Sequence, residues 1–193
     1  MLHNKEYLII SKYLSDYKQE IYGRSLTEKV KMSQKAIALA FEELEKQNVL
    51  KSRKQGNIKY YSLNLENTEI KDIIAINEKI RKIEFLSKNR KLANLFKKDE
   101  RVVGIFGSYA RGEEKTTSDI DVFIIGTKQK KDYDELGKEF DFNISIKYFT
   151  EKEFKTRINE KNRLCDEIIK NHVLIFGSEK FIQLIWEEYY DLN

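Results

Sequence analysis

Residues 104–126 read GIFGSYARGEEKTTSDIDVFIIG, and this stretch decides the fold of the C-terminal half of the 193-residue chain. Two apolar runs of strand length flank a polar stretch, and Gly107-Ser108 ends the first run. Asp119 and Asp121 begin the second run, so on a strand both carboxylates point to the same face. Two carboxylates on one face repel each other and lose hydration unless a partner compensates them. We therefore expect a cation site at the start of the second strand.

Oxygen ligands of this kind suit Mg²⁺ or Mn²⁺, and phosphoryl transfer needs such an ion to neutralise a triphosphate. Asp119 and Asp121 are therefore predicted to be metal ligands and catalytic residues. A glycine lets the backbone come close to a phosphate, and a serine at a helix start offers a hydroxyl and a backbone N–H. The basic side chains between the two pairs either contact phosphates or stay solvated. The predicted nucleotide-binding residues are Gly107, Ser108, Arg111 and Lys115.

The pattern Gly-Ser, ten residues, then Asp-hydrophobic-Asp resembles the polymerase-β-type nucleotidyltransferase superfamily. Residues 104–126 look like the minimal nucleotidyltransferases of archaea and bacteria. The resemblance implies a small mixed-sheet domain that binds Mg-NTP and passes a nucleotidyl group to a hydroxyl acceptor. It also implies a further role known for minimal relatives, that of the antitoxin in a pair with a HEPN-type partner protein.

The superfamily places a third carboxylate on a neighbouring strand, and the matching strand is predicted over residues 140–148. Alternation puts Asp141 and Asn143 on the face that should meet the site. Residues 143–177 resemble a subgroup of winged-helix nucleotidyltransferase proteins in which asparagine takes the place of the acid, matching Asn143. An asparagine carbonyl can bind a metal but is a poor base. Asp141 and Asn143 both stay candidates, and a transferase and a catalytically degenerate, nucleotide-sensing domain stay open.

The N-terminal third is predicted to hold three helices and a hairpin. Apolar spacing indicates a helix over residues 4–22 and a second over residues 25–30, opened by a capping-box pattern. A three-residue turn leads to a third helix that Ser33 can cap. Two short strands then follow, on either side of a turn at Gly56-Asn57.

Positive charge is concentrated in the same third. Residues 1–63 contain 12 Lys and Arg against 7 Asp and Glu, whereas residues 64–193 contain 24 against 25. Residues 22–63 resemble the winged helix-turn-helix of archaeal and bacterial transcription regulators. The resemblance implies DNA binding by the third helix and the basic wing; the alternative is a module for protein interaction or dimerisation. The predicted DNA contacts are Ser33, Gln34, Lys35, Ala38, Lys51, Arg53, Lys54, Asn57 and Lys59.

A glycine-free stretch over residues 66–98 is predicted to be one continuous linker helix. Ile73, Ile76, Ile80 and Ile83 follow the 3-4-3 spacing of a short coiled coil. This seam favours a homodimer, although the same stripe could pack on a flanking domain.

The predicted fold class is therefore α+β. A winged helix-turn-helix over residues 1–65 is followed by the linker and dimerisation helix over residues 66–98. A polymerase-β-like nucleotidyltransferase domain with a mixed sheet then occupies residues 99–193. Apolar runs are far shorter than the ~20 residues that cross a bilayer, and the N-terminus has no signal-peptide pattern. One cysteine excludes an intramolecular disulfide, so we expect a cytoplasmic protein that binds no membrane.

Overall fold

The computed structural model describes residues 5–115, 118–130 and 132–190, and the chain divides into two compact units, residues 1–77 and 78–193. Each unit is described by itself. Within the described residues, no helix has the length and apolar character needed to span a membrane.

The first unit combines short helices with a three-stranded antiparallel sheet in the order β1-β3-β2. Its elements are α1 (Lys5–Ile10), β1 (Ile21–Tyr22), α2 (Gly23–Leu26), α3 (Gln34–Lys46), β2 (Leu50–Gln55) and β3 (Ile58–Leu63). The long helix predicted over residues 4–22 is wrong, because helix α1 ends at Ile10 and turns follow it. Tyr13 and Tyr17 from those turns are nevertheless fully buried, so the apolar pattern reported burial rather than a continuous helix.

The second and third helices differ in how well the sequence located them. Helix α2 spans Gly23–Leu26, so it begins two residues and ends four residues earlier than predicted. The Ser25 hydroxyl donates to the Tyr22 carbonyl instead of capping the helix. Ser33 caps α3 as predicted, because its hydroxyl accepts a hydrogen bond from the Ala36 N–H at 3.3 Å.

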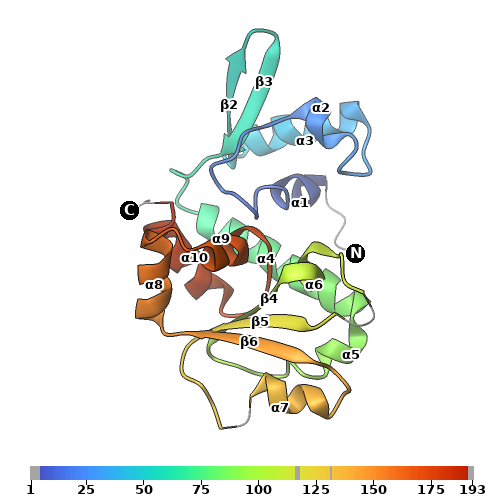
Figure 1. Cartoon of the computed structure of the whole chain (residues 1–193). Coiled ribbons are helices and arrows are strands. Elements are labelled where there is room, and N and C mark those ends of the chain that lie inside the picture. The colour runs from blue at the N-terminus through green and yellow to red at the C-terminus, as the bar shows by residue number, and fades with distance from the viewer. Residues whose placement is uncertain (1–4, 116–117, 131, 191–193) are drawn as a thin grey trace. The chain divides into compact units, whose positions relative to one another are not determined.

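The predicted hairpin is confirmed. Gln55 pairs with Ile58, which leaves Gly56-Asn57 as a two-residue turn, and Gly56 adopts φ +59°. The hairpin extends beyond the helices of its own unit (Figure 1).

The continuous helix predicted over residues 66–98 is wrong in extent. Helix α4 spans Ile70–Lys88 and stops at Asn89, whose φ of −114° and ψ of 56° lie outside the helical region. A separate short helix, α5 (Arg90–Ala93), follows. The boundary between the two units falls inside α4, after Asn77.

The second unit is built on a four-stranded sheet in the order β6-β5-β4-β7. Its strands are β4 (Val102–Phe106), β5 (Ile120–Ile125), β6 (Ile144–Phe149) and β7 (His172–Phe176). Its remaining helices are α6 (Gly107–Arg111), α7 (Tyr133–Lys138), α8 (Glu151–Asn159), α9 (Arg163–Lys170) and α10 (Ser178–Glu188). Strands β5 and β6 run parallel, whereas β4 is antiparallel to both β5 and β7. The mixed sheet predicted for this half is confirmed.

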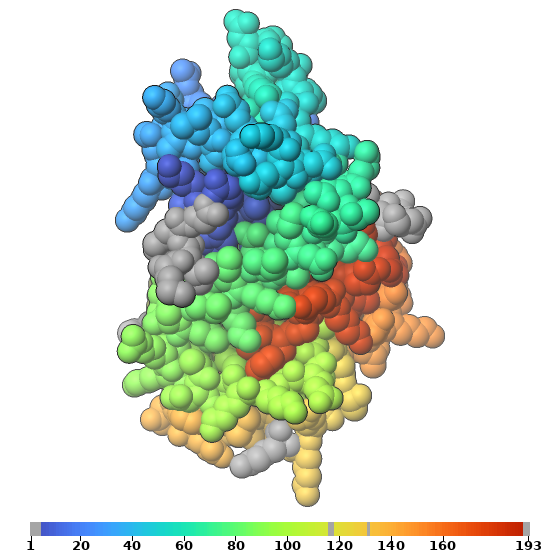
Figure 2. Space-filling view, turned by 180° about the vertical axis from the view of Figure 1, so that it is seen from behind, coloured from blue at the N-terminus to red at the C-terminus, as the bar shows by residue number. Residues whose placement is uncertain are grey.

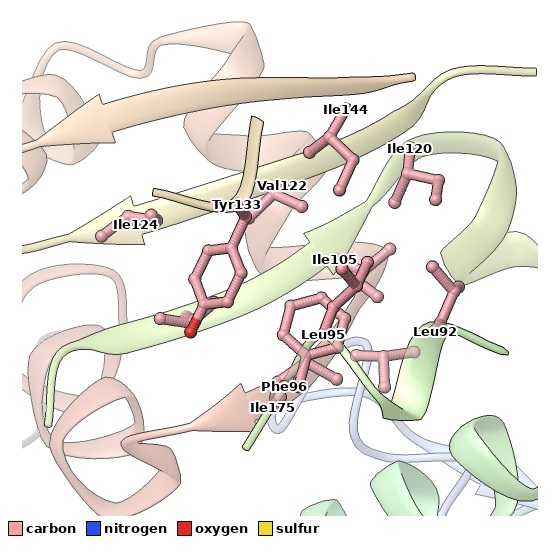
Figure 3. Packing of buried hydrophobic residues seen from close by; sticks show 12 residues of the cluster. Leu92, Leu95, Phe96, Ile105, Ile120, Val122, Ile124, Tyr133, Ile144 and Ile175 are labelled. Atoms are coloured by element: carbon pink, nitrogen blue, oxygen red, sulfur yellow. The ribbon is translucent and has the colours of Figure 1, made fainter. Parts of the chain in front are cut away.

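Alternation along the strands divides the sheet into two buried faces. On one face, aliphatic side chains pack against α5 and against Tyr133 of α7 (Figure 3). On the other face, Phe123 and His172 lie 5.6 and 4.9 Å from the ring of Phe181 in α10. Helices α8, α9 and α10 cover this second face (Figure 1). Asp119 and Asp121 lie an even number of residues before Phe123, so their side chains point to the same face of the sheet as Phe123. The candidate site therefore lies at one end of the face that these helices cover.

The C-terminal part of α4 packs along the end of the chain within this unit. His172 Nε2 lies 3.2 Å from Glu78 Oε1, and both side chains are fully buried. Lys79 pairs with Glu179, and the ammonium of Lys82 lies 4.5 Å from the centre of the Phe176 ring. From behind, the green residues of α4 lie beside the red C-terminal segment (Figure 2).

A buried ion network fixes the end of the sheet opposite the candidate site. The Arg101 guanidinium donates to both oxygens of Asp132 and also pairs with Asp99, and these three side chains are 10%, 3% and 4% exposed. Burial by itself raises the pKa of each carboxyl, but hydrogen bonds from Arg101 and its neighbours outweigh burial and hold both pKa values below the usual range.

Candidate functional site

The turn between β4 and α6 lies directly against Asp121. Phe106 pairs with Asp121 across the strands, and Gly107 turns the chain into α6 with φ +70°. A Cβ built on Gly107 would lie 2.6 Å from Asp121 Oδ2, closer than real Cβ contacts come. Gly107 is therefore favoured twice, because only glycine adopts this φ cheaply and a Cβ would force the Asp121 carboxylate to shift.

Ser108 follows on the first turn of α6. It is half-buried, and its hydroxyl makes no hydrogen bond with any residue that the structure describes. Its backbone is engaged, since the Ser108 carbonyl accepts a hydrogen bond from the Glu113 N–H at 2.9 Å. The hydroxyl is thus available to a ligand that reaches the turn.

The two carboxylates sit in unequal surroundings, because Asp119 is exposed and Asp121 is half-buried. Burial raises the pKa of Asp121 above its usual range, and the negative charges of Asp119 and Glu167 raise it further. The positive charges of Lys147 and Arg111 act in the opposite direction and lower this pKa. The ionised form of Asp121 is thus disfavoured on balance, although two cations lie near it. A divalent cation at this carboxylate would reverse that balance.

Asn143, and not Asp141, lies beside Asp119. The strand predicted over residues 140–148 is wrong at its start, because β6 begins at Ile144 and Asp141 lies in a turn with φ +58°. Asp141 is exposed there and does not share a strand face with Asn143. The side-chain amide of Asn143 donates to Asp119 Oδ1 at 2.6 Å, and the backbone carbonyl of Asn143 accepts from the Ile120 N–H at 2.9 Å.

Asp119 and Asp121 are the two carboxylates that a cation could use at this end of the sheet. Within the described part of the chain, no group of three or more His, Cys, Asp or Glu side chains could hold a metal ion. Mg²⁺, however, is commonly held by one or two carboxylates together with substrate phosphates and water. Two carboxylates, Asp119 and Asp121, match that number of protein ligands.

The two basic candidates of the connecting loop differ. The Arg111 guanidinium is held by two carboxylates, at 2.8 Å from Glu113 and 2.7 Å from Glu167. Lys115 is exposed, and its backbone N–H donates to the Ser118 hydroxyl at 2.9 Å. A phosphate therefore has to compete with two acids for Arg111 but not for the ammonium of Lys115, which has no ion pair among the described residues.

Glu167 was not predicted from the sequence. It lies on α9, 56 residues beyond Arg111, and no motif marks it. Only the packing of α9 beside the β4–α6 turn brings its carboxylate to Arg111 and near Asp121.

In the first unit, the predicted DNA contacts at the start of α3 all lie on the surface. Ser33, Gln34, Lys35 and Ala38 are exposed, whereas the opposite stripe of the helix is buried. At the hairpin turn, Asn57 is exposed as well.

The cations of the hairpin are less free than the sequence suggested. Although the hairpin contains no acid, acids from elsewhere in the unit reach three of its four cations. The pairs are Lys51 with Glu66, Arg53 with Glu20, and Lys59 with Glu45. Lys54 is exposed and has no ion pair within the described residues.

Comparisons with known proteins agree with this geometry. The profile of the family Polymerase beta, Nucleotidyltransferase matches residues 90–181. A Methanocaldococcus jannaschii protein named "Putative protein adenylyltransferase MJ1547" is 37% identical over 81 residues, which cover 41% of this chain and 59% of that protein. No solved structure matches the chain. Residues 90–181 therefore form a nucleotidyltransferase domain of the polymerase beta family.

Proposed function

We propose that the second unit transfers a nucleotidyl group from an NTP to a hydroxyl acceptor. The observation that carries this proposal is the fit of Gly107 against Asp121 inside a domain whose family is nucleotidyltransferase. In this reaction the acceptor oxygen bonds to the α-phosphorus, and the bond from that phosphorus to the bridging oxygen of the β-phosphate breaks. Pyrophosphate leaves with the bond's electron pair, and the hydroxyl proton passes to solvent.

Each residue of the site has a part in this scheme. Asp119 and Asp121 would hold Mg²⁺ or Mn²⁺, which supplies charge neutralisation at the triphosphate when it is bound. Gly107 admits a phosphate close to the backbone, and Ser108 offers a hydroxyl that no described residue binds. Asn143 orients Asp119 through its 2.6 Å hydrogen bond and has no basic group at neutral pH.

The similarity to the M. jannaschii protein supports an adenylyl group as the group transferred and a protein hydroxyl as the acceptor. The matched stretch covers 59% of that protein, so both assignments are proposals for this chain. The HEPN-type partner protein implied by the resemblance is a suitable first acceptor to test.

The test is transfer of label from ATP. We expect Mg²⁺-dependent transfer from α-labelled ATP and none from γ-labelled ATP, because pyrophosphate carries the γ-phosphate away. Asp119→Asn and Asp121→Asn should each abolish transfer, while Asp141→Asn, a matched change outside the site, should retain it. Binding of Mg-ATP without transfer to protein, nucleic acid or small hydroxyl compounds would instead favour the nucleotide-sensing alternative.

For the first unit we propose DNA binding as a winged helix-turn-helix, which would make the chain a regulator. The exposed start of α3, with Gln34 and Lys35 on its open face, supports this proposal. The ion pairs of the hairpin count against a strong phosphate contact by the wing, since a phosphate would have to displace Glu20 or Glu45. Salt-dependent binding to duplex DNA measures how many phosphates the unit contacts.

We also propose that α4 mediates a homodimer. Ile76 and Ile83 on the predicted seam are 56% and 54% exposed, and the other two seam residues, Ile73 and Ile80, are half-buried. An isoleucine stripe of this spacing with two exposed members is typical of a helix that pairs with a second helix.

A further inference from the structure

The edge strand β6 brings two polar side chains to the face of the sheet that carries the site. In the register of the parallel pair, Ser145 lies beside Asp121, and Lys147 follows two positions farther along β6. Paired residues of neighbouring strands point to the same face, so Ser145 and Lys147 share the face of the Asp121 carboxylate. Two positions farther again, Phe149 packs against Phe154 of α8, with the ring centres 5.4 Å apart. Helix α8 is one of the helices that cover the site's face, so this contact confirms the orientation (Figure 1).

The ammonium of Lys147 lies within electrostatic reach of Asp121. Of the charged side chains that shift the pKa of Asp121, Lys147 has the largest effect, and it lowers that pKa. Lys147 stands about 6–7 Å along β6 from the residue that pairs with Asp121, and its flexible four-carbon stem allows the ammonium to reach back toward the carboxylate. Strand order places this cation on the side of β5 opposite to β4 and the Gly107-Ser108 turn.

Lys147 is also free, in contrast to Arg111. Its side chain is exposed and has no ion pair among the residues that the structure describes. Arg111 is already held by Glu113 and Glu167, at 2.8 and 2.7 Å, so this trio carries a net negative charge. The hydroxyl of Ser145 is half-buried and makes no hydrogen bond within the described part of the chain. An anion can therefore bind at β6 without displacing an acid.

A nucleoside triphosphate needs such a group. Its phosphates carry more negative charge than one divalent cation neutralises, and the departing pyrophosphate keeps that charge. A lysine ammonium binds phosphate as a point charge, with three donors that rotate to suit the oxygens. An acceptor hydroxyl, by contrast, is uncharged before the reaction and gains less from a neighbouring cation. The charge and position of Lys147 therefore suit the nucleotide better than the acceptor.

We propose that Lys147 binds the β- and γ-phosphates of the nucleotide, with the Ser145 hydroxyl as a neighbouring donor. The polyphosphate then crosses the end of β5, from the Gly107-Ser108 turn to β6. This inference rests on nucleotide binding at the proposed site and adds a residue that distinguishes a triphosphate from a monophosphate. It does not depend on whether transfer follows binding.

The test is equilibrium binding of nucleotides to the full chain. A fluorescent ATP analogue is displaced by ATP or by AMP in the presence of Mg²⁺. Because contacts to charged groups contribute about tenfold or more in affinity, we expect Lys147→Met to weaken ATP binding at least about tenfold and AMP binding less than about twofold. Lys147→Arg keeps the charge and should retain the ATP affinity within about threefold. In the transfer assay, the KM for ATP should rise in Lys147→Met by the same factor as the dissociation constant.

A matched variant controls for the loss of a surface charge. Lys138→Met removes an exposed lysine from α7, which packs on the opposite face of the sheet, and it should leave both affinities unchanged. Circular dichroism of all variants verifies the fold.

Three results would overturn the assignment of Lys147: an ATP affinity that Lys147→Met leaves unchanged, an equal loss for ATP and AMP, or an equal loss in Lys138→Met. The proposed function fails separately. ATP binding that depends on Lys147, with no label transferred to any acceptor, would keep this binding residue and refute transfer. Transfer with the same KM for ATP in Lys147→Met and the parent protein would keep the activity and refute the assignment. A parent protein that binds no ATP would overturn both.

Discussion

Replacing Gly107 by alanine tests the central feature of the site, the fit between the β4–α6 turn and Asp121. The new Cβ would lie 2.6 Å from Asp121 Oδ2, whereas ordinary contact begins at 3.4 Å, so the carboxylate has to retreat by 0.8 Å. Crowding of this kind costs about 1–3 kcal/mol. Alanine at φ +70° adds about 1–2 kcal/mol of backbone strain. We therefore expect Gly107→Ala to lower the free energy of unfolding by about 2–5 kcal/mol.

The chain contains a matched control for the backbone cost. Gly112 ends α6 with the same φ of +70°, and a Cβ there would have no neighbour within 4 Å. Gly112→Ala should therefore cost only about 1–2 kcal/mol. In an Asp121→Ala background, Gly107→Ala should cost no more than Gly112→Ala, because the crowded oxygen is gone. Urea unfolding of the four proteins measures the coupling between Gly107 and Asp121.

Activity separates the two glycines further. A displacement approaching 1 Å at a reacting centre lowers rates by about 100-fold, so Gly107→Ala should lose about that factor in Mg²⁺-dependent nucleotidyl transfer. The transfer rate of Gly112→Ala should stay within about threefold of the rate of the parent protein, which is a small change beside the 100-fold loss. Equal destabilisation by the two alanines, together with full activity of Gly107→Ala, would refute the reasoning that the glycine makes room for the carboxylate.

Three other changes test separate parts of the chain. Arg101→Met should lower the free energy of unfolding by about 3–5 kcal/mol near neutral pH, because it leaves Asp99 and Asp132 buried without their cation. The pKa values of both carboxyls are lowered in the folded state, so this stabilisation is present above about pH 4 and lost as pH falls further. If urea titrations show that the stability lost by Arg101→Met does not shrink on acidification, this account is wrong. Lys54→Ala should reduce the slope of log affinity for duplex DNA against log salt by about one if the hairpin contacts phosphate, and an unchanged slope would remove the wing from the interface. Ile76→Glu should dissociate a dimer in light scattering while changing stability by no more than about 0.5 kcal/mol, and an unchanged mass would argue against pairing through α4.

Local patterns determined much of the second unit. The apolar run that Gly107-Ser108 ends became β4, and the run that Asp119 and Asp121 begin became β5. The placement of Asp121 on the same face as Phe123 follows from the two-residue period of a strand. In the first unit, the Ser33 cap and the Gly56-Asn57 turn are likewise contained in a few consecutive residues. Such features depend on neighbours in sequence, and the sequence therefore predicts them.

Periodicity failed where an apolar residue was buried without belonging to a regular element. Tyr13 and Tyr17 kept a helical spacing in a stretch of turns, because their burial depends on packing against the rest of the unit. Phe142 extended the alternation of β6 by sequence, yet the chain turns through Asp141 at φ +58° before the strand begins at Ile144. An apolar pattern reports which side chains are buried, and it does not report the backbone path between them.

The sequence by itself determined a nucleotidyltransferase domain with Gly107-Ser108 and an Asp119, Asp121 pair, because each of these signals lies within one short segment. Only the tertiary structure decided which groups surround that pair. Asn143 lies against Asp119 from a neighbouring strand, and Glu167 reaches Arg111 from a helix 56 residues farther along the chain. Charged groups interact with their neighbours in space, and these neighbours can be far apart in the sequence. The electrostatics of a site are therefore set only once the chain is folded.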